Sequence, residues 1–353
     1  MTPGFFSAIL LATEAAGFHL QDLAFEPDQA LAQAVWSFTK QKPLRVTQPT
    51  FSHLKELIRD YLILINQPAS YPQLHIASLS RLASEFGFPF FVSQPDPSLI
   101  GKVQTELENA LKNSGHFIHF HGQSLQLESG TWWLAKAGEL ETLPLYDRTE
   151  IEIVRFLNNN PGGTFREIYA YLCECLPGLL TPNLSFIQAC LASYAIPEAE
   201  NKDYWVIREA ETITNRRMDV LDIQDKLIKL GQQLGYQSRQ QQETVLWLDF
   251  SGQPVYKFFV IASSIISRFV LQPNCMQTTQ CVLVFPASRS NLLAYKLQND
   301  LRLTSATKSN WHFLKFRHLR TIAERTNLTL EMWQSLLDQD PPVWQELSQM
   351  ALF

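Results

Sequence analysis

The sequence is poor in long hydrophobic runs, in charge and in cysteine. No apolar run in its 353 residues reaches the roughly 18 residues of a transmembrane helix, so we expect no membrane-spanning segment. Charged residues make up only 18% and hydrophobic residues 46%, which is typical of a protein with a packed core and not of a disordered chain. The five cysteines are odd in number and have no paired spacing, which predicts reduced thiols and a cytoplasmic location.

Several enzyme signatures are also missing. There is no Gly-rich cofactor strand and no (D/N/S)PP(Y/F/W) methylase loop; the nearest match, Asp340-Pro341-Pro342-Val343, lacks the aromatic residue. His116, His119 and His121 have no acidic or cysteine neighbour, so we expect neither a metal nor a cofactor. The apolar N-terminus has no basic residue before Glu14, which predicts a buried helix and not a signal peptide.

Charge is distributed unevenly behind the net value of −5. Residues 215–325 contain 15 Lys and Arg against 7 Asp and Glu, whereas residues 1–214 contain 14 against 23 and residues 326–353 contain 0 against 4. A basic segment within an acidic protein indicates an anion-binding face. Nucleic acid is the leading candidate, DNA ahead of RNA, and an ordinary solvated basic surface is the alternative.

The pattern of apolar residues predicts a multi-domain α/β protein. We expect a helical N-terminal segment at 1–48, with helices over 5–18 and 27–40. Residues 49–140 predict helices over 51–66, 71–86 and 97–113, and then short strands over 117–120, 124–127 and 131–134. Three helices followed by a β-hairpin is the order of a winged-helix domain.

A second winged-helix-like domain is predicted at 141–212. Thr164 and Glu167 have the spacing of a capping box at the start of a helix, and Tyr204–Arg208 is a predicted strand. The third helix, from Thr181 to about Tyr194, contains no Lys or Arg. Because a helix in the major groove normally supplies positive charge, this domain is predicted to be structural or protein-binding and not a DNA reader.

Residues 213–325 follow the order helix, strand, strand, helix, strand, helix. The pattern predicts a helix over 218–234, strands over 244–250, 255–262 and 281–285, and a helix over 288–298. The stretch VLWLDFSGQPVYKFFVIASSII resembles the restriction-endonuclease-like (PD-(D/E)XK) families, in which "vW.d..g.p.y.FEVE.s..I" carries the active site. The resemblance implies a nuclease-like fold over about 215–325, with C-terminal helices at 326–353.

The chemistry of that motif is not preserved. In such families two acidic or polar side chains alternate on the second strand and face a metal held by an aspartate. The corresponding residues here are Phe259 and Ile261, which cannot bind Mg²⁺, so the site at Asp249 is predicted to be degenerate. An active nuclease would need carboxylates that have migrated, such as Asp219, Asp222, Asp225 or Glu243.

Another resemblance begins at Pro144. PLYDRTEIEIVRFL, LPGLLTPNLSFIQACLASYA and YWVIREAETITNRRMDVLDIQDKLIKLGQQLGY resemble regions downstream of the catalytic domain in large bacterial DNA-methylase-type proteins. This implies an auxiliary chain whose methylase or other effector lies on another polypeptide.

Candidate phosphate contacts lie in the basic segment. Ser288-Arg289-Ser290 is predicted to open a helix, and Lys296 lies two turns further on the same face. From Trp311 to Arg320 the sequence alternates as a strand and then enters a helix, with aromatic residues between the basic ones; we expect Phe313 and Phe316 to be core residues. The predicted phosphate contacts are Arg289, Lys296, Lys308, Lys315, Arg317 and Arg320.

These features together predict a non-catalytic nucleic-acid-binding or scaffold subunit of a bacterial restriction- or defence-like machine. A methylase or a defence effector is the expected protein partner. An active nuclease and a purely protein-binding adaptor are the two alternatives, since neither fold decides function by itself.

Overall fold

The computed structural model describes residues 20–22, 36–38, 53–86, 97–113, 115–120, 126–136, 140, 142–241, 243–271, 279–308, 310–337 and 339–342. The chain divides into two compact units. Unit 1 contains residues 1–64 and 68–139, and unit 2 contains residues 65–67 and 140–353. The fold belongs to the mixed α/β class, as expected.

Unit 1 contains three helices followed by a two-stranded hairpin. The elements are α2 (Leu54–Ile65), α3 (Tyr71–Phe86), α5 (Pro97–Asn113), β3 (Phe117–Phe120) and β4 (Thr131–Leu134). The two strands pair antiparallel. Trp132 and Trp133 of β4 are buried, and so are apolar side chains of the three helices. The predicted order of helices is confirmed. The strand expected over 124–127 is wrong at Gln126 and Leu127, which lie in the turn before β4 and not in a strand.

The N-terminal segment differs from expectation at one place. Strand β1 (Leu20–Asp22) pairs antiparallel with β2 (Trp36–Phe38). The expectation of a helix over 27–40 is therefore wrong at residues 36–38, which form a strand. Trp36 and Phe38 alternate with Ser37, and aromatic residues favour strands. The remainder of the two expected helices, 5–18 and 27–40, lies outside the described residues.

The first half of unit 2 combines three helices with a small sheet. The elements are α6 (Leu145–Asn159), β5 (Gly163–Thr164), α7 (Phe165–Cys175), α8 (Leu184–Tyr194), β6 (Ala195–Pro197) and β7 (Tyr204–Ile207), and the strand order is β5-β7-β6. The capping box is confirmed. The Thr164 hydroxyl accepts from the backbone N–H of Glu167 at 3.2 Å, and the Glu167 carboxylate accepts from the backbone N–H of Thr164 at 2.8 Å.

The second half of unit 2 is built around a five-stranded sheet of order β12-β11-β10-β9-β8. The strands are β8 (Gln237–Gln241), β9 (Thr244–Leu248), β10 (Pro254–Val260), β11 (Gln280–Phe285) and β12 (Trp311–Lys315). The pairs of β10 with β11 and of β11 with β12 are parallel, and β8 and β9 complete the sheet antiparallel. The pattern missed β8, because its sequence QSRQQ is polar throughout and it forms an exposed edge of the sheet.

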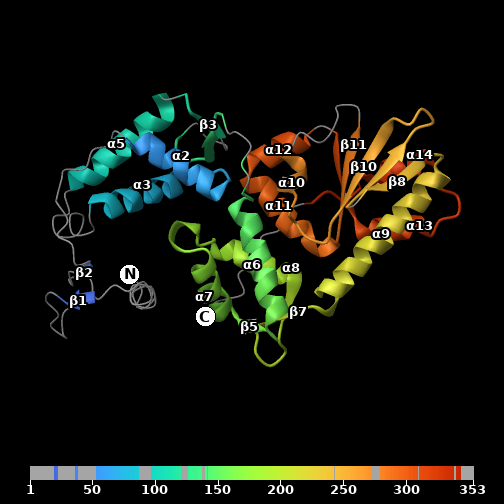
Figure 1. Ribbon diagram of the computed structural model, residues 1–353, viewed down its shortest axis with the longest axis horizontal. Coiled ribbons are helices and arrows are strands. Elements are labelled where there is room, and N and C mark those ends of the chain that lie inside the picture. The colour runs from blue at the N-terminus through green and yellow to red at the C-terminus, as the bar shows by residue number, and fades with distance from the viewer. Residues whose placement is uncertain are drawn as a thin grey trace. The chain divides into compact units, whose positions relative to one another are not determined.

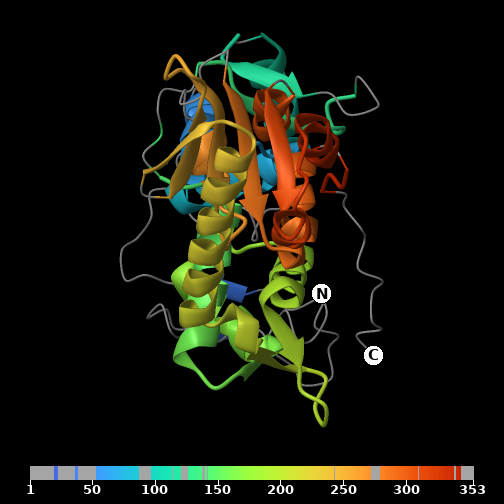
Figure 2. The same cartoon turned by 90° about the vertical axis from the view of Figure 1, so that its right-hand side faces the viewer.

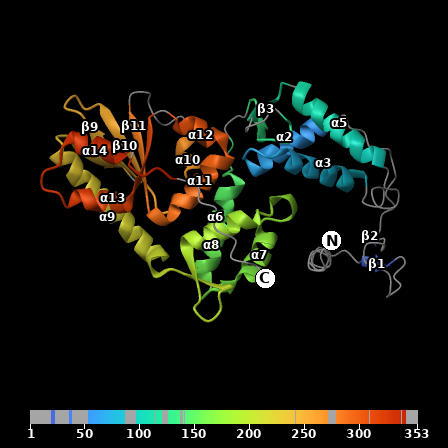
Figure 3. The same ribbon diagram turned by 180° about the vertical axis from the view of Figure 1, so that it is seen from behind.

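Helices cover both faces of this sheet (Figures 1 and 3). On one face lie α9 (Ile213–Gln233), α13 (Phe316–Ala323) and α14 (Leu330–Leu337); on the other lie α10 (Ser267–Val270), α11 (Ser290–Asn299) and α12 (Leu301–Thr307). Helix α9 begins five residues before the predicted start, at Ile213. Figure 2 shows α9 (yellow) extending past the strands towards the small sheet of the first half of the unit.

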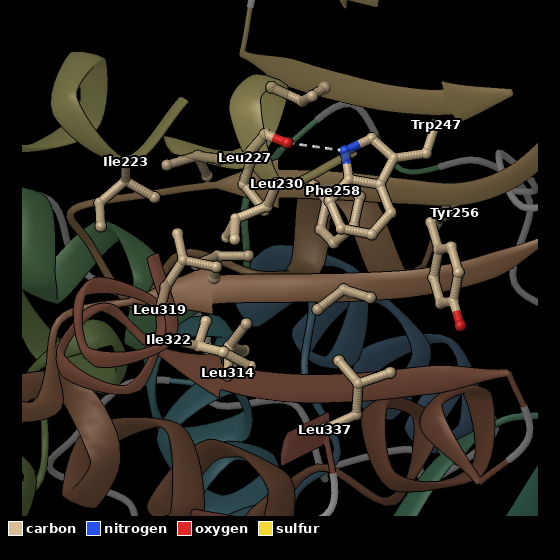
Figure 4. Packing of buried hydrophobic residues seen from close by; sticks show 14 of the residues in the cluster. Ile223, Leu227, Leu230, Trp247, Tyr256, Phe258, Leu314, Leu319, Ile322 and Leu337 are labelled. Atoms are coloured by element: carbon tan, nitrogen blue, oxygen red, sulfur yellow. Dashed lines mark hydrogen bonds between the residues drawn. The ribbon is translucent and has the colours of Figure 1, made fainter. Parts of the chain in front are cut away.

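Aromatic residues form the centre of the core between the sheet and α9. Trp247 of β9 is fully buried, and its indole N–H donates to the carbonyl of Leu227 on α9 at 2.9 Å (Figure 4). Gly231 permits this close approach, because a Cβ at that position would lie 2.5 Å from the Trp247 indole nitrogen. Trp333 and Leu337 of α14 belong to the same core, so this C-terminal helix is part of the sheet domain.

The opposite face of the sheet has a second aromatic group. Phe259 packs between Phe269 and Trp311, with ring centroids 4.9 and 5.3 Å away. Phe316 is buried, as predicted, and Phe313 is half-buried.

Two expectations from composition concern the membrane and the cysteines. Within the ranges given above, no helix combines the length and apolar character needed to cross a membrane. Cys173, Cys175 and Cys190 are free thiols, whereas Cys281 at the start of β11 is disulfide-bonded, so the expectation of reduced thiols is wrong there. An odd count of cysteines does not exclude one bridge.

Candidate anion-binding site

Asp249, the aspartate of the nuclease-like motif, shapes the hairpin between β9 and β10. Its Oδ1 accepts hydrogen bonds from the backbone N–H groups of Ser251 at 2.8 Å and Gln253 at 2.9 Å. The Ser251 hydroxyl also donates to it, and these bonds lower the pKa of Asp249. Gly252 supplies the positive φ of 81° that the turn requires. The local role of Asp249 is therefore that of an Asx-turn residue.

The other two motif residues lie at the far end of the hairpin. Phe259 pairs with Thr244 in the ladder, five residues before Asp249, which corresponds to about 17 Å along the strand at about 3.4 Å per residue. Phe259 and Ile261 are both buried. The geometry thus separates Asp249 from the positions where the motif would place its metal ligands.

The possible migrated carboxylates are Asp219, Asp222, Asp225 and Glu243. Three of the four are engaged in ion pairs: Asp219 and Asp222 with Arg320, and Glu243 with Arg268. Asp249 follows Leu248, which pairs with Gln237 just beyond the C-terminal end of α9. The three aspartates lie in the first two-thirds of that helix, and therefore away from Asp249. The described residues contain no group of three or more His, Cys, Asp or Glu placed to hold a metal ion.

Lys296, a predicted phosphate contact, lies in the interior of unit 2. Its side chain on α11 is fully buried, and its ammonium donates to Asp147 at 2.5 Å, Glu150 at 2.6 Å and the Ser264 carbonyl at 2.9 Å. All three N–H donors of the ammonium are used. The hydroxyl of Ser264 donates to Glu150 at 2.5 Å. Lys296 therefore belongs to a closed hydrogen-bond network and presents nothing to solvent.

The charges of this network are set by burial and by one another. Burial alone would raise the pKa of Glu150, but the charge and hydrogen bonds of Lys296 and the hydrogen bonds of Ser264 outweigh it and bring the pKa to about 2. Burial opposes the charge on Lys296, yet Asp147 and Glu150 together raise its pKa. For Asp147 burial prevails and Glu150 adds to it, so its pKa is raised. Lys296 and Glu150 form the ion pair, and Asp147 is the carboxyl that takes up a proton more readily.

Arg289, the second predicted phosphate contact at this end of α11, is also fully buried. Its guanidinium donates to the Ser193 carbonyl at 2.6 Å, to the Ala262 carbonyl at 3.1 Å and to the carboxylate of Glu211. It lies 3.4 Å from the centroid of the Tyr194 ring, in a cation–π contact. Arg289 and Lys296 are predicted phosphate contacts; in this conformation both side chains are enclosed and matched to carboxylates, so neither presents a donor to a ligand.

These two cations occupy the edge of the sheet where the parallel strands end. Ala262 and Ser264 follow β10, and Arg289 follows β11. In open α/β sheets, ligands commonly bind at the carboxyl ends of the strands. Here side chains of α6 and α8 fill that edge instead, so segments 141–212 and 213–325 share a buried polar interface within one unit.

A different cluster of cations lies at the surface, where β12 runs into α13. The carboxylate of Asp340 accepts from Lys315 Nζ at 2.6 Å, Arg317 Nη2 at 2.5 Å and His318 Nε2 at 2.9 Å. Hydrogen bonds from Lys315, His318 and Arg317 hold the pKa of Asp340 far below its usual range. Side-chain exposure is 59% for Arg317 and 29% for Asp340, so solvent reaches the cluster. We call Lys315, Arg317 and His318 the β12–α13 cluster.

The last two predicted contacts also lie at the surface. Arg320 joins α13 to α9 through Asp219 at 2.7 Å and Asp222 at 3.2 Å, which raises its pKa although burial opposes this. Lys308 is exposed at the end of α12. The structure thus brings Lys315 and Arg317 together, and it separates them from Arg289 and Lys296.

Several residues of these networks were missed by sequence reasoning, although a signal was present. Asp147 and Glu150 lie on the same stripe of α6 as the buried Ile153 and Leu157, and a charged residue in an apolar stripe indicates a buried partner. Asp340 lies in a tail with four acidic and no basic residues beside a basic segment, which is a signal of charge complementarity.

Comparison of the chain with protein-family models, with curated proteins and with solved structures finds no significant match.

Proposed function

We propose that the protein is a non-catalytic nucleic-acid-binding or scaffold subunit of a bacterial restriction- or defence-like machine, acting in the cytoplasm with a methylase or effector on another chain. The order of elements supports a nuclease-like interpretation of residues 213–325: a long helix, three antiparallel strands, and then a parallel strand reached through a helical connection. In 49–140, three helices precede a hairpin. In 141–212, three helices are interleaved with a three-stranded sheet, and both orders support a winged-helix interpretation.

The observation that carries the proposal is the β12–α13 cluster. Lys315 and Arg317 place two permanent cations and His318 a third donor around one partly exposed anion position. The three residues belong to the segment with 15 basic against 7 acidic residues. Arginine and lysine are the residues that most often contact the phosphate backbone of nucleic acids. The position of these side chains at the end of a strand and in the first turn of a helix fixes them on rigid elements.

The proposal that the protein is non-catalytic rests on the residues at the metal positions. Phe259 and Ile261 supply hydrocarbon where the related motif has acids, and Asp249 is engaged in its own turn. A nuclease would require acids from elsewhere. Of the candidates, Asp219 and Asp222 on α9 pair with Arg320, and Glu243 pairs with Arg268 at 2.7 Å.

A protein-binding adaptor is the second candidate, favoured by two observations. Helix α8, the third helix of segment 141–212, is buried along much of its length and packs on α11, with Phe186 5.0 Å from Tyr295 between ring centroids. It therefore cannot enter a groove of DNA in this conformation. Helix α9 also exposes Ile213, Met218 and Leu221, which are apolar side chains suited to a protein partner.

A titration separates these two functions. The purified chain is titrated with duplex DNA, single-stranded DNA and RNA at two salt concentrations, beside Arg317→Ala and the exposed control Lys308→Ala. The proposal predicts binding that weakens with salt, and weakens more with Arg317→Ala than with the control. Absence of binding to all three nucleic acids would favour the adaptor.

A further inference from the structure

We propose that the β12–α13 cluster is a phosphate site for the nucleic-acid backbone and that Asp340 occupies it in the free protein as an internal anion. This inference rests on the proposed function and adds the ligand group, the residues that bind it and the segment that competes with it. The ligand is a phosphodiester oxygen pair, for which the two carboxylate oxygens of Asp340 stand in.

The geometry of the contacts supports a site for an oxyanion. The two oxygens of Asp340 are used separately: Oδ1 accepts from Lys315, and Oδ2 accepts from Arg317 and His318. A phosphodiester group likewise presents two charged oxygens, and charge-assisted hydrogen bonds from Arg and Lys are the strong contacts that such groups form. The cluster therefore already has donors directed at one anion position.

The exposure of the donors distinguishes this cluster from the buried cations. Lys315 has only 8% of its side chain exposed, so its ammonium is held at the site, whereas Arg317 is 59% exposed and reaches into solvent. The buried Lys296 and Arg289 have no exposed surface and therefore no path for a ligand. Arg320 differs again, because it has two carboxylate partners, both from α9.

Asp340 is placed to act as a displaceable occupant. Helix α14 is anchored by the buried Trp333 and Leu337, and Asp340 follows three residues after the helix ends. The ion pair of Asp340 with the exposed Arg317 contributes little to stability, whereas its pair with the nearly buried Lys315 must be replaced by the incoming anion. Residues 326–353, the segment that carries Asp340, contain four acidic and no basic residues.

The first arm of the test measures DNA affinity. Asp340→Asn is compared with wild type and with Glu331→Gln, which removes the same charge from an exposed position on α14. Both variants remove one negative charge, but only Asp340→Asn removes the competitor for the cluster. At low salt we therefore expect Asp340→Asn to bind duplex DNA about threefold to tenfold more tightly than Glu331→Gln. Equal affinity of the two variants would overturn the role of Asp340.

The second arm does not depend on DNA. Thermal unfolding is measured in inorganic phosphate and in chloride at equal ionic strength. We expect phosphate to raise the unfolding temperature of Asp340→Asn more than that of wild type or of the double variant Asp340→Asn/Arg317→Ala. An equal phosphate effect on all three proteins would overturn the phosphate site.

The two arms separate failure of this inference from failure of the proposed function. A phosphate effect confined to Asp340→Asn without DNA binding by any variant would keep the anion site and reject nucleic acid as its ligand. DNA binding by wild type with equal affinities for Asp340→Asn and Glu331→Gln would keep the proposed function and reject the internal anion.

Discussion

Two groups of cations in unit 2 differ in their partners and in how far solvent reaches them. Lys296 is enclosed by α6, α11 and the end of β10, with every donor matched to an acceptor of the same chain. The β12–α13 cluster gathers on the single carboxylate of Asp340, and solvent reaches both Arg317 and Asp340. Both groups come from the segment with excess positive charge, so local charge alone does not tell a structural cation from a ligand-binding one.

The difference arises from desolvation. A buried ammonium must be compensated in full, and it then becomes part of the core. An exposed cation keeps most of its hydration and can exchange one anion for another at small cost. We therefore expect Lys296 and Arg289 to contribute mainly to stability. We propose that the exposed Arg317, beside the nearly buried Lys315, contributes mainly to binding.

The largest expected effect is on stability at the buried network. Lys296→Met leaves Asp147 and Glu150 without their counter-ion, and we expect the free energy of unfolding to fall by about 3–5 kcal/mol. Urea denaturation followed by circular dichroism measures this. Lys308→Met, at an exposed lysine, is the control and should change stability by no more than about 0.5 kcal/mol. Equal effects of the two substitutions would end the distinction between the regions.

The pH dependence of stability sharpens the same contrast. The folded-state pKa of Glu150, about 2, lies below its ordinary value of 4.5, so its contribution is present above pH 4.5 and is lost as pH falls towards 2. We expect the difference in the free energy of unfolding between wild type and Glu150→Gln to decrease by on the order of 2 kcal/mol between pH 7 and pH 3.

Asp147→Asn is the matched control for that experiment. The raised pKa of Asp147 predicts a pH effect of the opposite sign. The free energy of unfolding of wild type, relative to that of Asp147→Asn, should increase as pH falls through the folded-state pKa of Asp147. Denaturation midpoints at several pH values measure both differences. The same pH trend for both variants would contradict the assignment of Glu150 as the ionised partner of Lys296.

At the β12–α13 cluster we expect a small effect on stability and a larger effect on DNA affinity. Arg317→Ala removes an exposed ion pair, and we expect it to change the free energy of unfolding by less than about 1 kcal/mol. Its affinity for duplex DNA should fall several-fold at low salt, because one phosphate contact is lost. Fluorescence anisotropy with labelled duplex provides the affinity, and urea denaturation of the same sample provides the stability.

The smallest effect is expected at the motif aspartate. Asp249→Ala removes the hydrogen bonds that shape the β9–β10 turn but touches neither cation group, so DNA affinity should remain within about twofold of wild type. A loss of nucleic-acid cleavage in this variant, measured against an active wild type, would instead favour the nuclease alternative.

Elements with a clear apolar period could be predicted from the sequence. The helices of unit 1, the strands β9 to β12 and the capping box at Thr164 all follow local patterns of residues. Strand β8 could not be predicted in this way, because QSRQQ has no apolar period and forms a strand only by pairing with β9. Its structure is imposed by the tertiary fold.

The candidate site was predicted less completely than the fold, for a related reason. The spacing of Arg289 and Lys296 places them on one face of α11, but it does not show that α6 and α8 cover that face. Lys315 and Arg317 lie close together because they are neighbours in sequence. Asp340 was not, since its approach to them depends on the packing of α14 through Trp333.

The most direct test of the central claim is the salt dependence of duplex DNA affinity for wild type and for Lys315→Gln/Arg317→Gln. If these two cations contact phosphates, the slope of log K against log salt concentration should become shallower by about 1.8, at about 0.9 per contact. An unchanged slope would contradict the assignment of the β12–α13 cluster as the binding surface and would leave the two groups of cations alike in function.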